Sequence, residues 1–188
     1  MPITTMMNSD CPVIRLTGSI DMPVGYALLD EIKLLHDYYQ FRTIELEIDS
    51  PGGDVDALHY IVQALAPWIR GEGRVLKTRA LNQAASAGAM LLSFGTLGHR
   101  AASPHSRLLY HNMRTSFADG SSHTLAQLKA REKSLGVWER RFIDLLVEHV
   151  GHGQNKAAYR KRLGRLINQE RYITASVAHE LRLIDKVE

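Results

Sequence analysis

The sequence predicts an α/β fold, and two patterns lead to that prediction. Within the first 94 residues, a segment of strand-like apolar pattern is followed three times by a segment with apolar residues at helical spacing. Strands that are joined through helices run parallel, because a short turn joins only antiparallel neighbours. The 188 residues, 45% of them hydrophobic, suit one compact domain over residues 1–188 with a sizeable core.

The first half of the chain supplies the three strand–helix pairs. Ile44, Leu46 and Ile48 alternate with acidic residues, which predicts a strand with one buried face. The SPGG sequence at 50–53 predicts a tight turn after it. In chain order we expect strands at 13–16, 43–49 and 74–80, and helices at 22–35, 54–68 and 84–94.

The second half of the chain is dominated by one long helix. Two short strands at 99–103 and 107–111 and a polar loop at 113–122 precede it. Leucine, tryptophan and phenylalanine then recur at intervals of three, four and seven over 123–149, a helix of roughly 40 Å. Such a helix is longer than a small domain is wide, so we expect part of it to pack on another subunit. A shorter helix, an extended piece at 172–173, a helical turn after Thr174 and a strand at 183–187 complete the chain.

Composition excludes several classes of protein. Cys11 is the single cysteine and cannot form an internal disulfide, and no apolar run is long enough to cross a bilayer. The first ten residues lack the basic and apolar parts of a secretory leader, so we expect a soluble, cytoplasmic protein. The basic stretch at 156–171 has no nucleic-acid motif and is typical of a solvated helix face, so we expect no nucleic-acid partner.

Ser86 is the first candidate for chemistry. It lies among alanines and glycine in NQAASAGAM, where a strand gives way to a helix. Small neighbours allow a substrate backbone to approach, and the free N–H groups at a helix start favour a developing oxyanion. A packed small-residue helix would give the same pattern, so the motif alone leaves both interpretations open.

Two further candidates follow strands. The glycines of SPGG can adopt positive φ and expose backbone N–H groups at the end of a strand, although a plain turn would use the same residues. His111 ends another strand, 25 residues after Ser86. The nine histidines include no HExxH pair, and we expect neither a metal nor an organic cofactor.

Several motifs in one order make the assignment specific. The chain resembles the Clp protease proteolytic subunit family over about residues 13–187. The matching positions are 16–18, 48–53, 83–89, 92–93, 95–96, 98, 100, 104, 106–107, 111, 178 and 183–185. The resemblance implies a Clp-protease/crotonase-like spiral of ββα units with a protruding long helix, assembled as a ring of seven subunits or as two stacked rings around a digestion chamber.

The resemblance also implies a Ser-His-acid peptidase. By position, Ser86 is the nucleophile and His111 the general base, and the N–H groups of Gly53 and Ala87 line the oxyanion hole. A serine hydroxyl needs a neutral imidazole to accept its proton, and the imidazole needs an acid to fix its tautomer.

The acid departs from the family pattern. The family has an aspartate where this chain has Glu170, which keeps the charge and lengthens the side chain by one methylene. Three alternatives stay open: a surface glutamate paired with Arg171, a Ser-His dyad, and a Ser-Lys dyad through Lys129 or Lys133.

We therefore expect a hydrolase, a serine endopeptidase that cleaves peptides or unfolded protein segments through an acyl-enzyme. A catalytically impaired ring-forming assembly protein and a crotonase-like acyl-CoA enzyme are the alternatives. The loop at 112–122 lacks the glycine-rich pattern of the family, and the segment before residue 13 is short, as in phage-associated or stand-alone relatives. The sequence does not decide whether an ATP-dependent unfoldase is a partner.

Overall fold

The computed structural model of the chain describes residues 2–114, 122–151 and 153–188. The chain forms two compact units. Unit 1 comprises Met1–Tyr110 and Arg171–Glu188, and unit 2 comprises His111–Glu170. Unit 1 holds the sheet with its helices, and unit 2 holds two helices.

The sheet of unit 1 is mostly parallel, as the alternation of strands and helices predicts. Its order is β1-β2-β3-β4-β5-β7, and β6 pairs with β4. Only the β1–β2 pair is antiparallel among the pairs described. The strands are β1 (Ile3–Met6), β2 (Val13–Ile20), β3 (Thr43–Gly53), β4 (Val75–Ala85), β5 (Arg100–Ala102), β6 (Arg107–Leu109) and β7 (Lys186–Val187). Strand β1 was not expected from the sequence.

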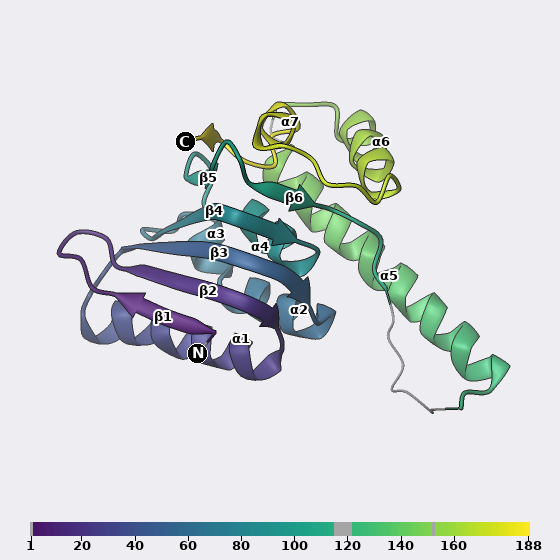
Figure 1. Cartoon of the computed structure of the whole chain (residues 1–188), viewed down its shortest axis with the longest axis horizontal. Helices are drawn as coiled ribbons and strands as arrows, with labels where there is room; N and C mark the ends of the chain where they lie inside the picture. Colours follow the sequence, from purple (N-terminus) through teal and green to yellow (C-terminus); the bar gives the residue numbers. More distant parts are fainter. Residues whose placement is uncertain (1, 115–121, 152) are drawn as a thin grey trace. The chain divides into compact units, whose positions relative to one another are not determined.

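Most helices of unit 1 lie along the sheet, and the last of them contacts β6 and β7 at its edge (Figure 1). They are α1 (Met22–Lys33) with a π-helical turn (Leu34–Tyr38), α2 (Val55–Ala64), α3 (Ala66–Ile69), α4 (Ala87–Ser93) and α7 (Ala175–Glu180). Asp21 and Asp54 cap α1 and α2 by accepting backbone N–H groups. The single helix predicted at 54–68 is two helices, because the chain breaks at Leu65 and Pro67 begins a new first turn.

The core lies under one face of the sheet. Ile44, Leu46 and Ile48 are fully buried, and each contributes about 1.5–3 kcal/mol by its removal from water. Glu47, on the opposite face, accepts two hydrogen bonds from the Arg15 guanidinium, at 2.7 and 2.9 Å. The predicted one-sided strand is therefore confirmed.

Two predicted boundaries next to the candidate site are wrong. Strand β3 continues through SPGG to Gly53 instead of turning at residue 50, with a register shift between Ile48 and Ser50. Strand β4 runs on to Ala85, and α4 begins only at Ala87. Alanine is uncommon in strands, so Ala84 and Ala85 favour the start of a helix in the sequence. In the structure, residues 83–85 pair with β6 and therefore extend the strand.

Unit 2 contains the predicted long helix. Helix α5 (Leu125–Val150) has 26 residues and begins with a capping box between Thr124 and Gln127, and α6 (Lys156–Ile167) packs on it. Lys156 pairs with Glu148 of α5 at 3.2 Å. Residues 115–121 of the predicted polar loop lie outside the described residues.

The apolar stripe of α5 is covered over only part of its length. The C-terminal part buries Phe142, Leu146, Val147 and Val150. The N-terminal part leaves Leu125 and Leu128 exposed, by 67% and 39%, and Leu135 and Trp138 half-buried. In the described part of the chain, no helix has the length and apolar character needed to span a membrane.

Candidate active site

Ser86 occupies the junction between β4 and α4, as the sequence predicts. Its backbone has φ 53° and ψ −123°, a conformation that costs a residue with a Cβ about 1–3 kcal/mol. The Ser86 N–H donates to the carbonyl of Leu109 at 2.8 Å, and its carbonyl accepts the first helical bond from Met90. Ser86 therefore links the pairing of β4 with β6 to the first turn of α4.

This turn also leaves the side chain of Ser86 accessible. Ala85 and Ala87 are buried, whereas Ser86 is half-buried. The Ala87 N–H is among the first N–H groups of α4, which have no carbonyl partner within the helix. A nucleophile on a strained strand-to-helix turn, followed by free N–H groups, is the arrangement that α/β hydrolases use.

The glycine that lies against Ser86 is Gly52. Its φ is +98°, and a Cβ added to it would lie 2.5 Å from the Cβ of Ser86 and 2.9 Å from the N of Ala87. Gly53, the predicted oxyanion donor, lies beside Ile20 of β2. Close approach thus explains both glycines of SPGG, while the donor role of Gly53 stays a prediction.

Ser50 is a residue of this site that the sequence did not single out for a role. It is fully buried, donates its hydroxyl to the Gly18 carbonyl at 2.6 Å and accepts the Gly52 N–H at 3.0 Å. Its Cβ would lie 3.2 Å from a Cβ at Gly88, so this side of α4 packs directly on Ser50. Ser50 continues the alternation of Ile44, Leu46 and Ile48, and this position was the sequence signal that could have identified it.

His111 follows β6 by two residues. Its Nδ1 lies 2.5 Å from the carbonyl oxygen of Asn112. Because a carbonyl only accepts, Nδ1 carries the hydrogen in the neutral ring, and Nε2 is left as the basic nitrogen. The tautomer required of a general base is thus the one that this bond selects.

Glu170 has a different partner in this structure. Its carboxylate accepts a hydrogen bond from Arg114 at 2.6 Å, and its side chain is 40% exposed. Its φ is 45°, one of four positive φ values at described residues other than glycine. The predicted contact between Glu170 and His111 stays a prediction, and the alternative pairing with Arg171 is not the one observed.

The segments that lead to His111 and away from Glu170 are paired in unit 1. Leu108 and Ile173 exchange both backbone hydrogen bonds, at 3.1 and 2.8 Å. The Arg107 guanidinium lies over the Tyr172 ring, 5.5 Å from its centroid. Each candidate therefore lies three residues along the chain from this bridge.

Among the described residues, no three histidine, cysteine or acidic side chains are grouped to hold a metal ion. The chemistry that these groups can supply is that of an accessible hydroxyl, an imidazole and backbone N–H donors. This set suits nucleophilic attack on a carbonyl.

Comparison with known proteins agrees with this class. The model of the Clp protease family matches residues 3–188. The chain therefore belongs to the Clp protease family, and this membership supports a serine protease.

Similar proteins include three named ATP-dependent Clp protease proteolytic subunit 2. Those of Corynebacterium glutamicum, Corynebacterium jeikeium and Corynebacterium diphtheriae are each 29% identical over 175 residues. The alignments cover 93% of this chain and 80%, 78% and 81% of the respective relatives.

The close approach of Gly52 to Ser86 gives a testable prediction. Gly52→Ala places a Cβ 2.5 Å from that of Ser86, so we expect a stability loss of about 2–4 kcal/mol from strain and overpacking, and loss of activity. Gly98→Ala is the matched control, because Gly98 has φ +84° and no described atom within 4 Å of the added Cβ. Urea unfolding and a peptide-cleavage assay measure both, and equal effects of the two substitutions would contradict the close approach.

Proposed function

We propose that this chain is a serine endopeptidase of the Clp proteolytic-subunit type that cleaves peptides or unfolded protein segments. The backbone of Ser86 is the observation that carries the proposal. A φ of 53° at a residue with a Cβ is strained, and such strain persists where it serves a function. Family membership supports a nucleophilic role for this strained serine.

The reaction is acyl transfer through Ser86. His111 Nε2 takes the hydroxyl proton as Oγ forms a bond to the substrate carbonyl carbon, and the carbonyl electrons move to oxygen. The N–H groups of Ala87 and Gly53 stabilise that oxyanion. Collapse breaks the C–N bond, and the proton passes from His111 to the leaving amine. Water then hydrolyses the acyl-enzyme by the same steps, and no metal or organic cofactor takes part.

Glu170 is the proposed third member of the triad. Within unit 2 its carboxylate is bonded to Arg114, and His111 Nδ1 is bonded to Asn112, so both groups must exchange partners to form the triad. The Asn112 carbonyl already selects the required tautomer. A Ser-His dyad assisted by that carbonyl is the alternative that this observation favours.

The test is reaction with a fluorophosphonate followed by peptide mapping. We expect Ser86 alone among the serines to be labelled near pH 7, because only this serine has a proposed general base and proposed oxyanion donors to activate it. The relatives are ATP-dependent by name, but acyl transfer consumes no nucleotide, so short peptides should be cleaved without ATP. Labelling at another serine would contradict the assignment.

We also propose that both units act as one functional domain of a cytoplasmic homo-oligomeric ring, with seven subunits or two stacked heptamers. The uncovered N-terminal part of the α5 stripe, with Leu125 and Leu128 exposed, supports this proposal, since uncovered apolar side chains that share one face are typical of an interface. Protein segments are then the substrates that the ring encloses. Neither the assembly-protein nor the crotonase-like alternative finds support in the comparisons.

The assembly prediction is tested at Leu128, which is 39% exposed. Leu128→Asp should weaken the ring while leaving the subunit folded, because the side chain is not part of the buried stripe. Lys129→Asp is the control at the neighbouring exposed position. Native mass spectrometry measures the subunit number, and a wild-type monomer at micromolar concentration would contradict the proposal.

A further inference from the structure

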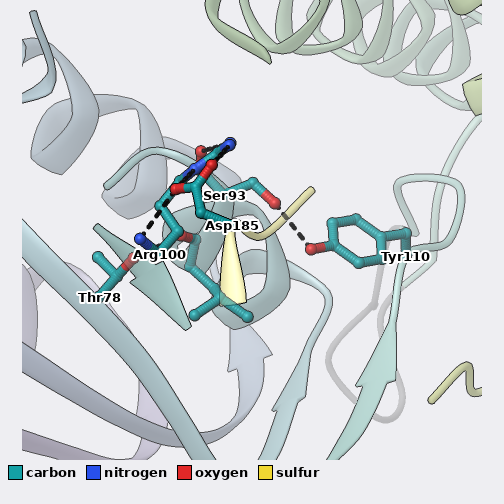
Figure 2. A network of polar contacts seen from close by, with 6 residues as sticks. Thr78, Ser93, Arg100, Tyr110 and Asp185 are labelled. Carbon is teal, nitrogen blue, oxygen red and sulfur yellow. Dashed lines mark hydrogen bonds and ion pairs between the residues drawn. The ribbon is translucent and has the colours of Figure 1, made fainter. Parts of the chain in front are cut away.

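A network of polar contacts lies in unit 1 at the C-terminal end of α4 (Figure 2). Arg100 is 2% exposed and donates two hydrogen bonds to the carboxylate of Asp185, at 2.6 and 2.8 Å. Burial opposes the charge of Asp185, but the hydrogen bonds and charge of Arg100 hold its pKa below the usual value. The pair is therefore a fixed bidentate contact.

This pair holds the C-terminal end of α4. Arg100 Nη1 donates to the carbonyl of Ser93 at 3.2 Å, and the Thr78 hydroxyl donates to the carbonyl of Leu92 at 2.7 Å. The last carbonyls of a helix lack partners within the helix, and a cation beside them is favourable. The end of α4 is thus bonded to two strands of the sheet.

The network ends at Tyr110. The hydroxyls of Ser93 and Tyr110 lie 2.7 Å apart, and their residues are 0% and 2% exposed. At the other end of α4, the Ser86 N–H donates to the carbonyl of Leu109. The residues at the two ends of α4, Ser86 and Ser93, are therefore bonded to the consecutive residues Leu109 and Tyr110. The next residue in the chain is His111.

We propose that Tyr110 is a positioning residue, whose hydrogen bond to Ser93 sets the place of His111 relative to Ser86. This inference rests on the proposed function. A phenylalanine would fill the same buried space, so packing does not require the hydroxyl. The bond fixes the direction of the Tyr110 side chain and thereby the backbone that carries His111. A misplacement of about 1 Å in a catalytic group is enough to lower a rate on the order of a hundredfold.

The test compares Tyr110→Phe, Ser93→Ala and the double variant in the full-length chain. We expect each single substitution to lower kcat by about 10-fold to 100-fold with KM within about twofold, because orientation changes and substrate contacts do not. The rate constant for fluorophosphonate labelling of Ser86 should fall in parallel. Tyr60→Phe, at a 42% exposed tyrosine of α2, is the control and should keep the wild-type values.

The double variant separates positioning from stability. Each single change breaks the Ser93–Tyr110 bond but keeps the other hydroxyl in the buried site, whereas the double change removes both hydroxyls, so the double variant should regain a Tm near that of the wild type. Its kcat should stay as low as in the single variants, because all three lack the same bond. A double variant that regains the wild-type kcat, or single variants at the wild-type kcat, would overturn the positioning role alone. A wild-type protein unlabelled at Ser86 would overturn the proposed function and this inference together.

Discussion

Ser86→Ala is expected to lower peptide cleavage by at least about a thousandfold and to abolish fluorophosphonate labelling. The substitution removes one heavy atom, the hydroxyl oxygen of Ser86, and without this oxygen no acyl-enzyme forms. The fold should remain, because serine and alanine each place a Cβ on the same backbone at φ 53°. Cleavage of a fluorogenic peptide, with circular dichroism for the fold, measures both expectations.

Two companion variants sharpen this prediction. Ser9→Ala changes an exposed serine far from α4 in the sequence and should keep the wild-type rate. Ser86→Gly should be inactive and at least as stable as Ser86→Ala, because glycine relieves the strain of a positive φ. Cleavage that persists in Ser86→Ala would move the nucleophile elsewhere. A glycine variant less stable than the alanine variant would contradict the strained backbone.

Glu170→Gln has the second-largest expected effect. Neutralising the acid of a triad leaves the geometry but removes the charge that orients the imidazole and stabilises the imidazolium. We expect kcat to fall by about a hundredfold to ten-thousandfold. KM should change little, because the acid does not touch the substrate. Steady-state kinetics on one peptide measure both quantities.

Arg114→Met is the matched control for Glu170. It removes the 2.6 Å ion pair and leaves the carboxylate in place, so a carboxylate that serves His111 should retain or gain activity. Glu170→Asp keeps the charge and should retain more activity than Glu170→Gln. If Arg114→Met lowers the rate as much as Glu170→Gln, the ion pair itself matters. An unchanged rate in Glu170→Gln would mean a Ser-His dyad or a different acid.

The sequence by itself determined the helices and strands in which apolar residues recur at a regular interval along the chain. The alternation of Ile44, Leu46 and Ile48 predicted β3, and the spacing at 123–149 predicted α5 within two residues at its N-terminal end and one at its C-terminal end. Such periods record which side of one element faces the core. The motif around Ser86 likewise predicted a strand-to-helix junction, although α4 begins at Ala87 and not at residue 84.

Tertiary structure decided the features that depend on residues far apart in the chain. Residues 83–85 are a strand only because β6 pairs with them, and β1 is a strand only because β2 lies beside it. The contacts of Gly52 with Ser86, of Ser93 with Tyr110 and of Glu170 with Arg114 join residues 34, 17 and 56 positions apart. Side-chain partners depend on which distant segments of the chain come together in space, and such contacts leave no period in the sequence.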